Sequence, residues 1–265
     1  MLTIDSQGIV IDPRVNIKQS WSVNKKKEAV ELTSIIPTTP NRKDLGIPLG
    51  IVVHQTNSPT ASSAYNTMLN SKGVADAHFL IDKDGTIYQT FSLNFRAHHT
   101  GSIHSRCIRE QNCSEADAAK LNELYKKHWL NKSKIDAIEA KKSPPHSYPS
   151  NRDSVGIEVV GEPFAYEKDG TKSKNQDINP DKKIYEPLTE EQKESLEWLI
   201  RELSVSFKNE EGAVVRIPMT EIFFHSEISW KNPTEGKPAE ESRKRLQEEE
   251  AQRNKEAAET VQAEE

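Results

Sequence analysis

The chain has 265 residues, of which 34% are hydrophobic and 29% are charged, as expected for one or two folded domains with polar extensions. No apolar run approaches the roughly 18 residues that a membrane-spanning helix requires, so no transmembrane span is expected. The net charge is −5, and residues 238–265 contribute −4 of it, with five Lys or Arg and nine Asp or Glu. The near-neutral remainder argues against a protein that binds nucleic-acid phosphates.

Residues 1–45 form a mixed, polar N-terminal extension for which we predict one short strand, from Gly8 to Ile11. Five later segments are short, rich in β-branched or aromatic residues and bounded by turn-forming residues. They are therefore predicted as strands: 48–54, 77–82, 86–91, 154–161 and 221–225. The Asp84-Gly85 dipeptide between the second and third of these segments predicts a β-hairpin.

Two helices are predicted between these strands. Residues 60–72 begin with Thr60 as the cap, and the apolar face of this helix comprises Ala64, Met68 and Leu69. Residues 189–207 open on a Thr-x-x-Gln capping box and carry an apolar stripe of leucine and isoleucine. The order strand, helix, hairpin, strand, helix, strand predicts an α/β domain over residues 46–237, with a mixed central β-sheet flanked by helices.

Two segments lie outside this pattern. Residues 102–150 are predicted as an insertion that contains a charged helix over about 115–142 and both cysteines. Cys107 and Cys113 are either two free thiols or the ends of a small disulfide loop. Residues 238–265 predict a long, charged C-terminal helix, a tail or linker that is exposed to solvent.

Two of the eight histidines, His54 and His225, end predicted strands, where α/β folds place functional sites. The loop after His225 contains Glu227 and Glu235, and two neutral imidazoles with one carboxylate are a usual ligand set for catalytic zinc. No HExxH helix is present, so spacing alone also allows each histidine to be an ordinary hydrogen-bonded residue at a strand end.

Glu158 lies inside the apolar strand Gly156-Ile157-Glu158-Val159-Val160. Strand alternation places Ile157 and Val159 on one face of the sheet and Glu158 on the other. Burial of a carboxylate without partners is costly, so two interpretations remain. Glu158 either lies on a solvated face, or it is a general base whose pKa is raised by partial desolvation.

Four segments together resemble the type-2 family of zinc-dependent N-acetylmuramoyl-L-alanine amidases, which share their fold with peptidoglycan recognition proteins. In chain order they are GIVVHQT, ADAHFLIDKDGTIYQTFSLNFRAHHTG, DSVGIEVVGE and EIFFHSEISWKNPTEG. The resemblance covers residues 48–101 and 151–237. It implies hydrolysis of the amide between N-acetylmuramic acid and L-alanine in bacterial peptidoglycan. The alternative is a non-catalytic peptidoglycan-binding module on the same fold.

The resemblance also implies one Zn²⁺ per chain and a role for several side chains. The implied metal ligands are His54, His225 and Glu235, and the implied catalytic base is Glu158. The residues expected to contact substrate are His99, Asn57 and Thr234. A structural loop role is the alternative for His99.

The sequence departs from the family pattern around the third ligand. The family usually has aspartate or cysteine where this chain has Glu235, so Glu227 remains a competitor. Pro233 stands where the family often has lysine, and Lys231 or Lys237 could replace that lysine.

The implied partner is peptidoglycan or a muropeptide. The first residues lack a basic segment followed by a long apolar one, so no signal peptide is expected. We therefore expect synthesis in the cytoplasm and action on the cell wall in the periplasm after delivery or lysis, as a lytic enzyme or antibacterial effector. Such an effector would also meet secretion machinery and an immunity protein. The alternative is recycling of wall fragments in the cytoplasm.

Overall fold

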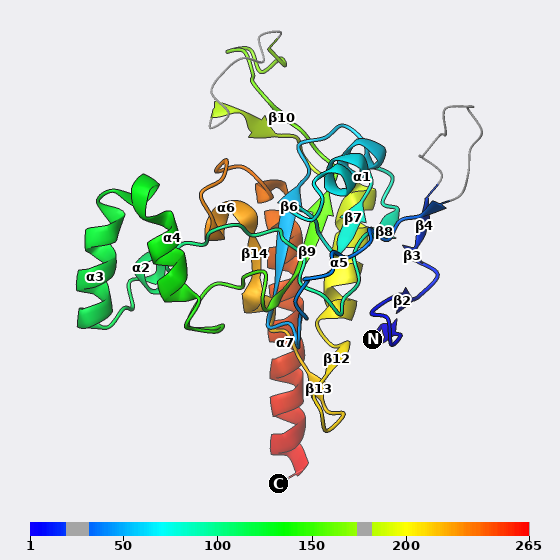
Figure 1. The fold of residues 1–265 in the computed structure, drawn as a ribbon. Coiled ribbons are helices and arrows are strands. Elements are labelled where there is room, and N and C mark those ends of the chain that lie inside the picture. The colour runs from blue at the N-terminus through cyan, green and yellow to red at the C-terminus, as the bar shows by residue number, and fades with distance from the viewer. Residues whose placement is uncertain (20–31, 174–181, 265) are drawn as a thin grey trace.

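A computed structural model describes residues 1–19, 32–173 and 182–264. Its centre is a six-stranded mixed sheet with the strand order β14-β6-β9-β7-β8-β3 (Figure 1). The strands are β3 (Val15–Asn16), β6 (Gly50–Gln55), β7 (Phe79–Ile81), β8 (Ile87–Gln89), β9 (Ser154–Val159) and β14 (Ile222–Phe224). Strands β14, β6, β9 and β7 run parallel, whereas β8 is antiparallel to β7 and parallel to β3. The predicted mixed sheet and hairpin are confirmed.

The N-terminal extension is more structured than its composition indicates. Its predicted strand corresponds to β2, and Val15 in β3 joins the central sheet beside Ile87. The other short strands form small two-stranded pairs. These are β1 (Thr3–Ile4) with β2 (Val10–Ile11), β4 (Lys18–Gln19) with β5 (Leu32–Thr33), β10 (Pro163–Phe164) with β11 (Ile184–Tyr185), and β12 (Phe207–Lys208) with β13 (Val214–Val215).

Helices pack on both faces of the sheet. Helix α5 (Glu190–Leu203) opens with the predicted capping box and buries its leucine stripe against one face. Helix α1 (Ala61–Asn70) belongs to the cluster that contains Leu80 and Phe91. Thr60 caps α1 as predicted, but Leu69 is 40% exposed and Tyr65 is buried in its place. The buried stripe follows the i, i+3, i+4, i+7 pattern from residue 61, which leaves Leu69 at its edge.

The insertion projects to one side of the sheet as three helices (Figure 1). They are α2 (Arg106–Glu110), α3 (Glu115–Tyr125) and α4 (His128–Glu139). The single charged helix that we predicted is therefore divided, because Lys127 leaves the helical region with φ −131°. Cys107 and Cys113 form a disulfide, so the interpretation as free thiols is wrong. Gln111 ends α2 in the left-handed region, and the backbone N–H groups of Gln111 and Asn112 donate to the carbonyl oxygen of Cys107.

The C-terminal helix α7 (Glu240–Glu264) is long and charged, as predicted. The expected solvent exposure applies only to its outer part, because Leu246 is 1% exposed and belongs to the core under α5. Arg243 pairs with Glu227, and Gln247 donates to the carbonyl of Met219. The start of α7 thus packs on the domain. Within the described ranges, no helix is both long and apolar enough to cross a membrane.

Candidate metal centre

The ends of three adjacent parallel strands meet at one corner of the sheet. His54 lies near the end of β6, and Glu158 is its register partner on β9. Both side chains point away from the α5 core, because the alternate residues of these strands belong to that core. His225 follows β14 directly as the first residue of α6 (His225–Ile228). The predicted alternation around Glu158 is confirmed.

Three side chains at this corner could hold a metal ion. Their ligand atoms all lie within 4.8 Å of one another: His54, His225 and Glu235. Glu235 Oε1 is 2.8 Å from His225 Nδ1 and 3.6 Å from His54 Nδ1, and the two Nδ1 atoms are 2.8 Å apart. All three residues are buried. Glu227, the competing ligand, instead accepts hydrogen bonds from Arg243 and the backbone N–H of Phe224.

The outer nitrogens of both histidines have partners of their own. His225 Nε2 lies 3.0 Å from the Thr100 carbonyl oxygen, which can only accept, so this nitrogen carries the proton. His54 Nε2 lies 3.0 Å from His99 Nδ1. With Nε2 protonated in each ring, both Nδ1 lone pairs and a carboxylate oxygen point at one space. A single proton cannot satisfy all these contacts, whereas a cation can, and the donor set fits zinc.

The pKa values of the cluster favour the binding of a cation. Burial and the nearby His225 lower the pKa of His54 to about 4, so its imidazole is neutral at pH 7. Burial opposes ionisation of Glu235, but the hydrogen bonds and charges of His225 and His54 outweigh it and lower the pKa of Glu235 to about 2. At neutral pH the cluster therefore contains an uncharged His54 imidazole and an ionised Glu235 carboxylate.

Glu158 differs from the ligand cluster. Its Oε2 atom is buried and, among the described residues, has no hydrogen-bond partner. Burial, and secondarily the Glu235 carboxylate, raises the pKa of Glu158 to about 8, while the positive charge of Lys231 opposes the rise. A half-buried carboxylate with a raised pKa and an unpartnered oxygen is suited to accept and return a proton.

A cavity of about 300 Å³ opens over this corner. Glu158, all three members of the cluster and two of the expected substrate residues, Asn57 and His99, line it. Thr234 is not among the described residues that line the cavity. Its hydroxyl is hydrogen-bonded to Asn232 and to the backbone N–H of Tyr185.

The structure places His99 behind the ligands. The residue is 8% exposed, and its ring lies between His54 and Ser154. An ideal Cβ at Gly156 would be 2.7 Å from the His99 ring, so glycine in the middle of β9 leaves room for it. This contact is compatible with the structural role that was the alternative for His99.

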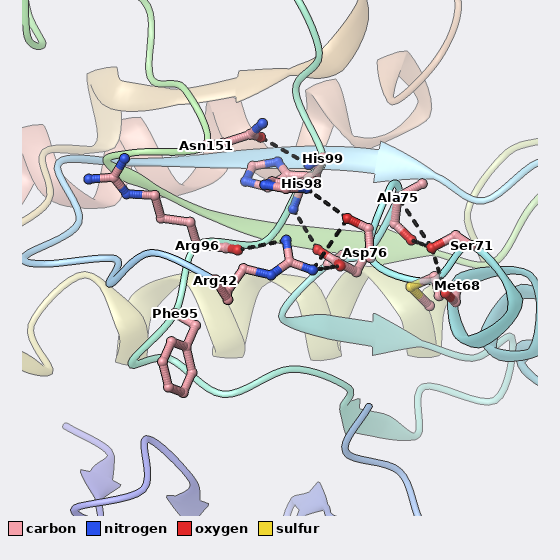
Figure 2. Close-up of polar contacts among 12 residues, drawn as sticks. Arg42, Met68, Ser71, Ala75, Asp76, Phe95, Arg96, His98, His99 and Asn151 are labelled. Carbon is pink, nitrogen blue, oxygen red and sulfur yellow. Dashed lines mark hydrogen bonds and ion pairs between the residues drawn. The ribbon is translucent and has the colours of Figure 1, made fainter. Parts of the chain in front are cut away.

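Sequence reasoning missed several contributors to the cavity wall. Tyr185 arrives from β11, and Asp76 comes from the segment before β7. Asp76 forms a buried ion pair with Arg42 and accepts from the backbone N–H of His98 (Figure 2). No local motif marks these residues. Lys231 lines the cavity, and Lys237 is not among the described residues that line it.

Comparison with known proteins identifies the family. The profile of the type-2 N-acetylmuramoyl-L-alanine amidases matches residues 44–238. No curated protein matches the chain significantly.

Three solved structures are similar to this chain, each at low identity. A mutant endolysin from Bacillus subtilis is 18% identical, with 73% of this chain and 82% of that chain covered and a TM-score of 0.36. A selenomethionine AmpD derivative is 15% identical, with 74% and 84% covered and a TM-score of 0.35. Drosophila PGRP-LB is 13% identical, with 75% and 84% covered and a TM-score of 0.35. The profile match alone spans most of the sequence, and by it the chain belongs to the type-2 N-acetylmuramoyl-L-alanine amidase family.

Proposed function

We propose that this protein is a zinc-dependent amidase that cleaves the bond between the lactyl group of N-acetylmuramic acid and L-alanine in peptidoglycan. One observation carries the proposal. A cluster of three converging acceptor atoms lies in the same cavity as Glu158, a carboxylate with one unpartnered oxygen. Family membership supplies the substrate class.

The residues divide the work between binding and proton transfer. His54, His225 and Glu235 would hold Zn²⁺, which supplies a Lewis acid for the scissile carbonyl and the attacking water. Glu158 takes a proton from that water as its oxygen adds to the carbonyl carbon. Glu158 then returns the proton to the nitrogen as the C–N bond breaks. The products are a lactyl carboxylate and a peptide with a free L-alanine amine.

Lys231 contributes positive charge at the mouth of the same cavity. Its ammonium group favours the ionised form of Glu158. The same charge would stabilise the oxyanion that develops on the scissile carbonyl. Asn57 lies on the cavity wall in the left-handed region, with φ 52°, and we assign it to substrate contact.

The setting of the reaction is a separate proposal. The N-terminal extension, the insertion and α7 add to the core fold, and we propose action on cell wall after delivery or lysis, with cytoplasmic recycling as the alternative. Intact sacculi and soluble muropeptides offered in parallel distinguish the two. Faster release from sacculi supports the lytic role, and cleavage of soluble fragments alone supports recycling.

The test of the activity is product analysis. Zinc-loaded protein is incubated with purified peptidoglycan, and released peptides are identified by mass. We expect peptides that begin with L-alanine, loss of release after chelation, and recovery with added zinc. Zinc-loaded protein that binds peptidoglycan but releases no peptide would contradict the proposal and favour the non-catalytic binding module.

A further inference from the structure

One short segment contacts both histidines of the metal cluster. His99 Nδ1 is 3.0 Å from His54 Nε2, and the carbonyl oxygen of the next residue, Thr100, is 3.0 Å from His225 Nε2. The orientation of both imidazoles therefore depends on where residues 99 and 100 lie. This segment precedes the insertion, and it is not part of a helix or strand.

The turn that follows the insertion holds this segment in place. Asn151 Oδ1 accepts from the backbone N–H groups of His99 and Thr100, both at 2.9 Å, and from the Thr100 hydroxyl at 3.0 Å. Figure 2 shows the contact between Asn151 and His99. A single amide oxygen thus fixes the backbone of both residues that contact the ligands, although Asn151 itself contacts none of the three.

The same turn also determines which ring nitrogen of His99, and through it of His54, carries the proton. The Ser154 hydroxyl donates to the Ser150 carbonyl oxygen at 2.6 Å, so its oxygen accepts from His99 Nε2 at 3.2 Å. With Nε2 protonated, His99 Nδ1 accepts from His54 Nε2. His54 Nδ1 is then left with a lone pair that faces Glu235.

We propose that Asn151 and Ser154 are positioning residues for the metal centre, and that they set its zinc affinity through His99 and Thr100. Asn151 fixes the backbone of residues 99 and 100. Ser154 fixes the protonated nitrogen of His99, and this leaves the lone pair of His54 on Nδ1, facing the cluster. Groups that orient metal ligands from behind typically change metal affinity by about 10-fold to 100-fold when removed. The inference rests on the proposed zinc site.

The experiment measures the zinc dissociation constant of full-length variants by competition with a chelator. Asn151→Ala removes the acceptor, and we expect zinc binding to weaken by about 10-fold to 100-fold. Asn151→Asp retains an acceptor oxygen and is expected to stay within about threefold of wild type on the same scale. Ser154→Ala is expected to weaken binding by about 10-fold. Asn112→Ala, which changes an exposed asparagine within the insertion, is the control.

Two further readouts separate positioning from general loss of structure. Thermal unfolding of the metal-free variants reports folding, and the visible absorption of the Co²⁺-substituted proteins reports ligand geometry. Equal loss of affinity in Asn151→Ala and Asn151→Asp would overturn the role of the acceptor. If Asn151→Ala does not fold, the zinc affinity of Ser154→Ala tests the proposal instead. A wild-type zinc affinity in Ser154→Ala would overturn it. Wild-type protein that binds no zinc would instead contradict the proposed function itself.

Discussion

The two sides of the cavity are built in opposite ways. In the ligand cluster, the outer nitrogen of each histidine has a hydrogen-bond partner, and the inner nitrogens of both rings face the Glu235 carboxylate. On the neighbouring strand β9, Glu158 keeps one buried oxygen without a partner in the described part of the chain. The ligand side chains are fixed in orientation, whereas the pKa of Glu158 is raised. The difference separates holding a cation from moving a proton.

The largest effect that separates the two sides is expected from Glu158→Gln. The amide keeps the shape of the side chain but cannot accept a proton as a carboxylate does, so turnover should fall by about 10²–10⁴-fold. Zinc content should stay at the wild-type level, because Glu158 is not in the cluster. Steady-state cleavage of a muropeptide and metal analysis of the same sample check both parts. Loss of zinc in this variant would show that Glu158 also takes part in metal binding, and it would contradict the comparison.

A smaller effect is expected from Lys231→Gln. Removal of a buried oxyanion donor costs about 10²–10³-fold in kcat, but Lys231 is exposed, so a loss of about 10-fold in turnover is expected. Zinc content should again be unchanged. Lys237→Gln is the matched control and should retain wild-type turnover. Equal losses in the two variants would show that general surface charge is responsible.

An effect on stability rather than on turnover is a pH dependence in metal-free protein. The pKa of Glu158 is about 8 in the fold against an ordinary value of 4.5. Between these values the folded chain holds a proton that the unfolded chain has released, so stability falls as pH rises, by at most about 1.4 kcal/mol per pH unit. Urea unfolding of wild type and Glu158→Gln between pH 4.5 and 8 measures the difference. The same pH dependence in both proteins would show that a group other than Glu158 binds the proton in the folded chain.

Much of the sheet and of its motifs could be predicted from the sequence. The strand ends at His54 and His225, the alternation around Glu158 and the Thr189 capping box depend on local patterns, and each pattern has its expected place in the structure. These signals need no information about residues far away in the chain.

The supporting contacts could not be predicted in the same way. Asn151 accepts from residues about 50 positions earlier, and Tyr185 enters the cavity from a two-residue strand. Leu246 is a single leucine in a charged helix, and α7 packs against α5 and buries it. Each of these depends on tertiary contacts, which leave no periodic signal in a single sequence.

The zinc stoichiometry of three proteins tests the central claim most directly: wild type, Glu235→Gln and Glu227→Gln. Both variants replace one carboxylate of the segment that follows β14 by an amide. Glu235 lies in the cluster, whereas Glu227 pairs with Arg243 on α7. We predict one zinc per chain in wild type and Glu227→Gln, and little or none in Glu235→Gln. Full zinc occupancy in Glu235→Gln, or its loss in Glu227→Gln, would contradict the ligand set on which the proposed function depends.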